Sequence, residues 1–578
     1  MELRTLLWCL IACVIGLPAV RAAAADAGQA APTHEELVKL GLKASDKDME
    51  WWHDAKFGIF IHWGVGMTRG APWMNSTDDA VYYPGLFENL KKVTKFNAAE
   101  WMDVVKASGG KYVIFMTKQN GYMQRRPGSN LCLWDTKTTD NKITHPQSPF
   151  RRDVCKEIAD AAHKAGIRLE WYHCGHAGEG LRELMTNYGK VSGVWFDGGS
   201  VPEGTTPEQA YQMMRKCQPG IVTNGALGGS KYGGDYGTPQ HAPPPPGWHR
   251  PPVEVAAILR NGYWYWDRPN CPVKSLKQVI DLLMRCVGGG NNLALNLAPA
   301  PDGHREPNEI SRIKEVGAWL GKYGQSVYET RKGPYSQYDW GVCTRSKTGN
   351  TIYLHMLNNP DDGKLVLPPL NKKIVAARIL TSPEGKVEVE QTDRQITIVI
   401  PPNHMNEIDT IVALELDGKA MDAKVAAVAP GAVTLGKPAK ASQVFTWPAV
   451  GATERSNGPH NALDGDLETG WCSTGGKGDK DPRRLEVDLG EPMKVGRGLV
   501  SLASALGEDR KAAREFEVQV RQGDNWVGIF SSKSLKGAER RQWDHAFAFT
   551  PVTGRLFRLL VWGENAYVRE FHLFKPDK

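Results

Sequence analysis

The feature that most constrains the fold is an alternation of short apolar segments with amphipathic ones between about Trp51 and Thr330. The apolar segments have the composition of buried strands: FGIFIHWG, KYVIFMTK, IRLEWYH, VSGVWFDGG, GIVTNG, GYWYW and NNLALNLAP. Helical patterns such as FNAAEWMDVVKASG and RRDVCKEIADAAHKAG lie between them. Repeated β–α units predict a parallel sheet, and this length suits a (β/α)8-like barrel over residues 46–335.

The rest of the chain lacks this alternation of strand and helix patterns. A chain of 578 residues is also too long for a single hydrophobic core. Strand and turn patterns without helices predict a β-sandwich over residues 336–418. A segment rich in Ala, Pro and Gly predicts a linker over residues 419–444. A second all-β unit is expected over residues 445–578. The fold class is therefore multidomain.

The amino terminus has the pattern of an export signal. Arg4 precedes an apolar stretch, and RAAAADA supplies small residues for cleavage. We expect a signal peptide over residues 1–25 and a secreted or periplasmic protein; the alternative is a lipoprotein anchored at Cys13, which ends LIAC. No segment is expected to span a membrane. The net charge of +7 is scattered without runs, so no nucleic-acid partner is expected.

Several polar residues end apolar strands, where the active sites of (β/α)8 barrels lie. They are His62, Lys118, Glu170, Tyr172, His173 and Asp197. Asp197 stands out because a carboxylate at the end of a buried strand is costly unless its charge is used. Its alternative role is a cap for the next helix. Two following glycines favour a site, since they keep bulk away from the carboxylate.

A set of motifs in the first 335 residues resembles glycoside hydrolase family 29, the exo-acting α-L-fucosidases. The motifs are KFGIFIHWGVG, GGKYVIFMTK, ELMTNYGKVSGVWFDGG, GDYGTP, GGGNNLALNLAPAPDG and GAWLGKYGQSVYETRKGPY. The resemblance implies a retaining mechanism in which Asp197, the acid of WFDGG, is the nucleophile. It also implies that no cofactor takes part in catalysis.

The second carboxyl group that a retaining glycosidase needs is harder to assign to a residue of this sequence. The family uses either a Glu in a TPE motif, where this chain has Gln240, or a Glu in a WE motif, where PPVEVAAILRNG retains Glu254. The resemblance therefore implies Glu254 as acid/base and favours α-1,3/1,4 linkages. The alternative role of Glu254 is a surface or helix-start acid, and Glu170 is the reserve candidate.

The resemblance also implies contacts to the sugar. The candidate substrate-binding residues are His62, Trp63, Trp73, Lys118, Gln119, Asn120, Tyr172, His173 and Trp195. Three departures from the family bear on the sugar. Gln119 and Asn120 replace a pair of histidines, an insertion containing Arg125 and Arg126 follows, and Gly225 stands where an Arg is expected.

The C-terminal unit resembles a discoidin domain, also called a factor 5/8 C-type domain, whose family includes carbohydrate-binding modules. The motifs are SNGPHNALDGDLETGWCST, RRLEVDLGE, REFEVQV, NWVGIF, GRLFRLLVWG and REFHLF. The resemblance implies a structural calcium site with oxygen ligands from Asp464, Asp466, Thr469 and Glu570. The alternative is a polar turn without metal.

The sequence as a whole predicts a secreted exo-glycosidase that removes terminal α-L-fucose from extracellular oligosaccharides or glycoconjugates. Two alternatives remain. One is a retaining hydrolase of α-L-galactose or a modified fucose. The other is a catalytically silent protein that binds glycans through its discoidin domain.

Overall fold

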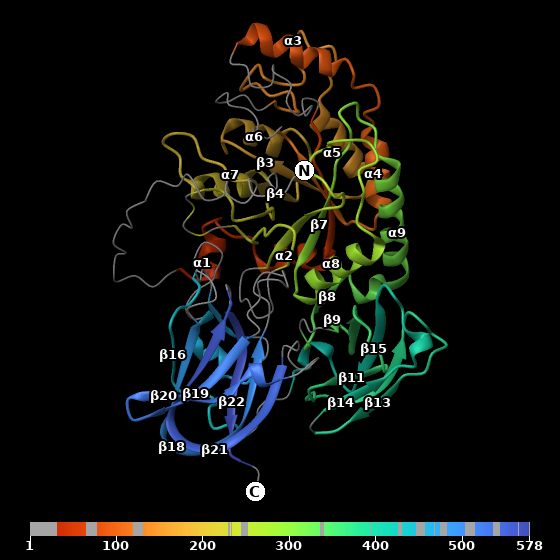
Figure 1. Ribbon diagram of the computed structural model, residues 1–578. Coiled ribbons are helices and arrows are strands. Elements are labelled where there is room, and N and C mark those ends of the chain that lie inside the picture. Colours follow the sequence, from red (N-terminus) through yellow and green to blue (C-terminus); the bar gives the residue numbers. More distant parts are fainter. Residues whose placement is uncertain are drawn as a thin grey trace, which may run out of the picture.

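The computed structural model describes most of the chain after its first 31 residues (Figure 1). The described residues are 32–64, 78–118, 131–228, 230, 232, 234–243, 252–335, 340–393, 395–425, 431–446, 457–466, 469–473, 482–502, 515–535, 544–563 and 566–576. The helical unit formed by the first part of the chain lies at one end, and two β-rich units lie at the other. The predicted signal peptide and Cys13 lie outside the described residues.

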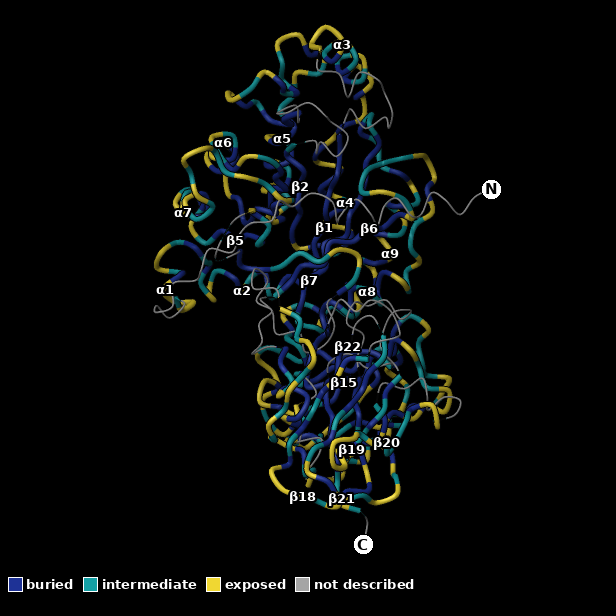
Figure 2. Tube along the Cα trace, turned by 60° about the vertical axis from the view of Figure 1, so that its left-hand side comes forward, coloured by how far each residue is buried: buried dark blue, intermediate teal, exposed yellow. Residues whose placement is uncertain are grey.

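Seven parallel strands form the centre of the first unit, in the order β5-β4-β3-β2-β1-β7-β6. They are β1 (Phe57–Ile61), β2 (Tyr112–Met116), β3 (Arg168–His173), β4 (Gly193–Phe196), β5 (Val222–Thr223), β6 (Glu254–Ile258) and β7 (Asn292–Leu297). Almost every residue in them is buried, as Figure 2 shows in dark blue. Strands covered on both faces read as continuous apolar runs, which is the pattern seen in the sequence.

An irregular eighth segment closes this sheet into a barrel. Residues 236–240 pair in parallel with both edge strands, through the bridges Asn224↔Tyr236, Gly237↔Val253 and Gln240↔Ala256. Gly234 makes the approach possible, because a Cβ there would lie 2.0 Å from the carbonyl oxygen of Asn224. The predicted (β/α)8-like barrel is confirmed, with the GDYGTPQ stretch as its irregular strand.

Helices surround the barrel (Figure 1). They are α1 (His34–Lys39), α2 (Asp46–Ala55), α3 (Asp79–Leu90), α4 (Ala98–Ala107), α5 (Val154–Ala165), α6 (Glu179–Thr186), α7 (Pro207–Cys217), α8 (Leu276–Gly288) and α9 (Pro307–Tyr323). Local sequence sets their ends. Ser275 and Gln278 form a capping box at the start of α8, and Gly166 ends α5 in the left-handed conformation. Within the described residues no helix has the length and apolarity needed to cross a bilayer.

The second unit is a sandwich of two antiparallel sheets. One sheet has the order β12-β15-β10-β9-β8 and the other β11-β14-β13. The strands are β8 (Thr330–Lys332), β9 (Gly341–Ser346), β10 (Thr351–Met356), β11 (Lys364–Leu367), β12 (Ile374–Ile379), β13 (Glu388–Gln391), β14 (Ile396–Val399) and β15 (Thr410–Leu416). Because β8 pairs with β9, this sheet begins before the predicted boundary at residue 336.

The sandwich packs against the barrel through α8. A Cβ on Gly288 of that helix would lie 2.5 Å from Cβ of Val342 in β9, so the glycine permits close contact. Val342, Ile411 and Ala413 of the sandwich belong to the same hydrophobic core as the barrel strands. The barrel and the sandwich therefore share one core.

The third unit is the predicted discoidin-like jelly roll, and its strand order is β17-β22-β18-β21-β19-β20, with β16 paired to β18. The strands are β16 (Ala439–Ala441), β17 (Trp471–Ser473), β18 (Arg483–Leu502), β19 (Glu515–Gln522), β20 (Asn525–Ser531), β21 (Asp544–Trp562) and β22 (Ala566–Phe574). Part of the predicted linker is folded. Ala420 lies in the core of the sandwich, and Val433 and β16 pack on the jelly roll.

Candidate active site

Asp197 lies at the carboxyl end of the barrel, directly after β4. Its Oδ2 accepts a hydrogen bond of 2.5 Å from the phenol of Tyr172, the fifth residue of β3. Asn224 fixes the backbone immediately before it, because its Oδ1 accepts from Phe196 N and its Nδ2 donates to Phe196 O, both over 2.7 Å. Asp197 is partly exposed, whereas Phe196 and Asn224 are fully buried. The carboxylate is thus held by rigid elements at a surface that a ligand can reach.

The two glycines after Asp197 were expected to keep bulk away from the carboxylate, and they also form a turn that needs glycine. Gly198 and Gly199 both have positive φ, 65° and 130°. A Cβ on Gly199 would also lie 2.9 Å from the carbonyl oxygen of Gly175. Only glycine fits this turn without strain, so the chain leaves the barrel beside Asp197 without placing a side chain over it.

His62 lies in the same layer of the barrel, with its ring 5.2 Å from that of Tyr172. Asn296 orients it. The amide nitrogen of Asn296 donates to the carbonyl oxygen of Trp264 over 2.7 Å, so its Oδ1 is the atom that faces His62 Nδ1 at 2.6 Å. His62 Nδ1 therefore carries the proton, which leaves Nε2 as an acceptor. Burial lowers the pKa of His62 to about 4, so the ring is neutral.

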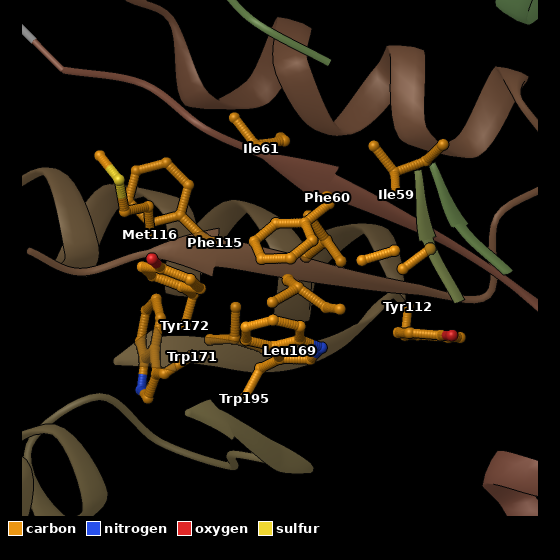
Figure 3. Packing of buried hydrophobic residues seen from close by; sticks show 14 of the residues in the cluster. Ile59, Phe60, Ile61, Tyr112, Phe115, Met116, Leu169, Trp171, Tyr172 and Trp195 are labelled. Atoms are coloured by element: carbon orange, nitrogen blue, oxygen red, sulfur yellow. The ribbon is translucent and has the colours of Figure 1, made fainter. Parts of the chain in front are cut away.

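Aromatic rings form the wall beneath this layer (Figure 3). Trp195 of β4 stacks on Tyr172 with ring centres 5.6 Å apart and planes at 23°. Phe60 of β1 contacts both of them, with centroid distances of 5.4 Å to Trp195 and 5.5 Å to Tyr172. Such packed rings hold Tyr172 in one orientation, which fixes its hydroxyl on Asp197.

Sequence analysis missed four residues at this site: Asn224, Trp264, Tyr265 and Asn296. Asn224 and Asn296 were not predicted, because each lies within a segment whose apolar neighbours indicate a buried strand. The expectation that GYWYW is a strand is wrong, because the strand ends at Ile258 and GYWYW is the irregular connection that follows. Its rings lie over His62, at 5.3 Å for both Trp264 and Tyr265. Aromatic residues just after a strand's carboxyl end were the available signal.

Three predicted contact residues occupy other surroundings. Trp63 is fully buried outside the barrel, stacked on Phe96 at 5.3 Å, and its indole N–H donates to Ala300 O. His173 is also fully buried, with Nε2 on the carbonyl oxygen of His176 at 3.1 Å. Both therefore have the surroundings of packing residues. Lys118 is partly exposed, with its ammonium 5.5 Å from the ring of Trp134.

The remaining predicted contacts lie outside the described residues. They are Trp73, Gln119 and Asn120, together with Arg125 and Arg126 of the insertion.

Glu254 and Glu170 lie deeper in the barrel than Asp197. Glu254 is the first residue of β6, and its Oε2 accepts a hydrogen bond of 2.5 Å from Tyr112, the first residue of β2. Glu170 accepts from Tyr236 over 3.1 Å. Both carboxyl groups are fully buried. Asp197 follows the last residue of its strand, whereas Glu254 begins its own. Because the strands are parallel, Glu254 lies towards the opposite end of the barrel.

Comparison with known families settles what kind of barrel this is. A family model described as α-L-fucosidase matches residues 24–177 and 176–325, which together are over half of the chain. The chain belongs to the α-L-fucosidase family. It is an α-L-fucosidase-like glycoside hydrolase, and the resemblance found in its motifs is confirmed. A second model, the F5/8 type C domain, matches residues 439–570.

Curated α-L-fucosidases align with much of this chain. The plasma α-L-fucosidase of Rattus norvegicus is 27% identical over 397 residues, which cover 58% of this chain and 82% of the rat protein. The tissue α-L-fucosidase of the same species is 23% identical over 450 residues, covering 67% and 93% respectively.

Solved fucosidase structures share the fold. Isoenzyme 1 of Paenibacillus thiaminolyticus superposes with a TM-score of 0.55 at 24% identity, covering 64% of this chain and 99% of that protein. The α-L-fucosidase of Vibrio sp. strain EJY3 superposes with a TM-score of 0.61 at 17% identity and covers 92% of this chain and 98% of its own.

The predicted calcium ligands of this fucosidase-family chain lie together in the jelly roll. Thr469 Oγ1 donates to Asp464 Oδ2 over 2.7 Å, and Asp466 N donates to Asp464 Oδ1 over 2.9 Å. Glu570 is buried beside them; burial and the charges of Asp464 and Asp466 raise its pKa to about 10. Crowded oxygen donors suit a hard cation. Across the described residues, however, no group of three or more acidic, His or Cys side chains has metal-binding geometry, so calcium stays a prediction.

Proposed function

We propose that this protein is a secreted, retaining exo-α-L-fucosidase that hydrolyses terminal α-1,3- or α-1,4-linked fucose of extracellular glycans. The observation that carries the proposal is the placement of Asp197, which is fixed by Asn224 and Tyr172 at the carboxyl end of the barrel and is partly exposed. A carboxylate so held can attack an anomeric carbon, and its charge favours an oxocarbenium-like transition state.

In the first step an Asp197 oxygen forms an ester bond to the anomeric carbon as the bond to the leaving oxygen breaks, and an acid protonates that oxygen. In the second step water attacks the same carbon, loses its proton to a base and releases Asp197. Tyr172 donates to the free carboxylate and positions it for the attack. His62 Nε2 and the faces of Trp264 and Tyr265 supply an acceptor and apolar surfaces suited to a deoxy sugar.

The linkage and the location rest on sequence. Gln240 takes the place of one family acid, which favours the α-1,3/1,4 group, and the export pattern of residues 1–25 favours secretion. The closest alternative substrate is α-L-galactose or a modified fucose. Gln119, Asn120 and the insertion after them favour it, because they replace the pair of histidines that the family has there.

The deciding experiment is turnover of 4-nitrophenyl α-L-fucoside by the wild type and by Asp197→Asn, followed by α-1,3- and α-1,4-fucosylated oligosaccharides and α-L-galactosides. Turnover of a fucoside that the substitution abolishes supports the proposal. Turnover of galactosides alone would assign the alternative sugar. Glycan binding without turnover of any of these substrates would make the protein a silent binder and end the proposal.

A further inference from the structure

Beneath the catalytic layer the barrel encloses two carboxyl groups, those of Glu170 and Glu254, which we name the buried carboxyl pair. Neither has exposed surface. Tyr236 donates to Glu170 and Tyr112 donates to Glu254. No Lys, Arg or His among the described residues forms an ion pair with either carboxyl, and the titratable groups that face them are the two tyrosines and each other.

Two carboxylates without a cation cannot both be charged in a dry interior, so at least one keeps a proton. Burial raises both pKa values, that of Glu254 to about 7 and that of Glu170 well above its usual range, with the charge of Glu254 adding to the rise at Glu170. Glu254 faces more donors: the Tyr112 hydroxyl and the indole N–H groups of Trp52 and Trp195, although the indoles do not reach full hydrogen-bond geometry. Glu254 is therefore the member that ionises, and Glu170 holds the proton.

Two glycines make space for Glu170 and for Tyr112, the partner of Glu254. A Cβ on Gly193 of β4 would lie 2.6 Å from the carboxyl carbon of Glu170. A Cβ on Gly58 of β1 would lie 2.3 Å from the ring of Tyr112. Neither glycine needs a special backbone angle, so both are explained by the space that the buried side chains occupy.

Trp195 connects the buried carboxyl pair to the site. Figure 3 shows its indole between Tyr172 and Tyr112. The indole ring stacks on Tyr172, and the indole N–H faces Glu254. Tyr172 in turn holds Asp197. We propose that Glu170 and Glu254 form a one-proton pair that positions Trp195 and, through it, Tyr172 and Asp197. This assigns Glu254 a positioning role in place of the acid/base role, and it rests on the proposed function.

The test is the rate at which 2-fluoro-fucosyl fluoride labels Asp197, followed by mass spectrometry, in wild type, Glu254→Gln, Glu170→Gln and Glu309→Gln. Glu309 is a matched control, a buried acid on α9 outside the barrel. We expect labelling to slow by about 10- to 100-fold in Glu254→Gln, as misplacement of a reacting group does. Glu170→Gln should stay within about threefold, because an amide resembles the protonated acid.

Turnover of fucosides with good and poor leaving groups separates the two roles of Glu254. A positioning residue predicts equal losses on all of them and no rescue by azide. Losses confined to poor leaving groups, with azide rescue, would restore Glu254 as acid/base and overturn the inference. Unchanged labelling in Glu254→Gln would overturn it too.

Infrared spectroscopy tests the shared proton without any activity. The carbonyl band of buried protonated carboxyl groups above pH 8 should be weaker in Glu170→Gln than in the wild type, and what remains should come from Glu570, whose pKa is raised to about 10. A band of equal intensity in the two proteins would overturn the inference. Tyr112→Phe serves if Glu254→Gln does not fold. It removes one donor to Glu254 and should raise the pH at which Glu254 loses its proton. A wild type that is not labelled at all would reject the proposed function while the infrared result still decides the pair.

Discussion

The phenol of Tyr172 donates to Oδ2 of Asp197 over 2.5 Å, from a ring that is itself stacked on Trp195. The contact joins β3 to the residue after β4, so it exists only when the two strands are in register, with Tyr172 opposite Trp195. A hydrogen bond to an ionised group is among the stronger ones in proteins. The relationship therefore couples the packing of the barrel to the orientation of Asp197, the proposed nucleophile.

Tyr172→Phe should lower kcat/KM for a fucoside by about 10- to 100-fold, since a hydrogen bond to a charged group contributes roughly 1.5–3 kcal/mol. Steady-state kinetics on an aryl fucoside would measure it. Tyr328→Phe is the control, because that hydroxyl donates to Gly109 O far from the site. Equal kinetics for Tyr172→Phe and the wild type would show that the contact does not support catalysis.

Asn224→Ala should reduce both stability and turnover. It removes both hydrogen bonds to the Phe196 backbone and leaves a buried N–H and C=O without partners, at a cost of about 1–3 kcal/mol for each. Urea unfolding followed by tryptophan fluorescence would measure the loss. Asn187→Ala, at an exposed position after α6, should leave both properties unchanged. Normal turnover in Asn224→Ala would mean that Asp197 is positioned without the two hydrogen bonds between Asn224 and the Phe196 backbone.

Stability should fall as the pH drops from about 6.5 to 4, in part because of His62. Burial lowers the pKa of His62 to about 4, whereas an unfolded histidine titrates near 6.5. The unfolded state then binds the extra proton, so about 3 kcal/mol that is fully present above pH 6.5 is lost by pH 4.

Urea unfolding at several pH values would measure this dependence. His62→Gln should show a shallower slope than the wild type. The slope would not vanish, because burial also lowers the pKa of His53 to about 4 and that of His173 to about 3. The same slope in both proteins would mean that folding does not change the pKa of His62.

Calcium should raise the melting temperature of the jelly roll if Asp464, Asp466, Thr469 and Glu570 bind it, because a ligand of the native state stabilises it. Differential scanning calorimetry with calcium and with a chelator would detect the shift. Glu570→Gln should remove the response. A transition that is indifferent to calcium would assign the cluster to a polar turn without metal.

The β–α alternation and the motif set were enough to predict the barrel, the two β units after it and the fucosidase family. They also brought out Asp197, because an acid and two glycines after an apolar run are visible in the local sequence. Such patterns are readable since they depend on neighbours along the chain and on the period of the strand or helix.

The sequence alone could not place Glu254, Trp63 or Asn296. A glutamate before an apolar run has the same local sequence pattern whether it lies at the amino or the carboxyl end of the barrel. Only its pairing with β7 and its contact with Tyr112 place Glu254 towards the amino end. His62 and Trp63 are adjacent in sequence, but their side chains point in opposite directions, so that His62 lies beside Tyr172 and Trp63 stacks on Phe96. Asn296 gains its role from the carbonyl of Trp264, thirty-two residues away. Local propensity determined the elements of this protein, whereas strand register and long-range hydrogen bonds, which exist only once the barrel has closed, decided which side chains meet.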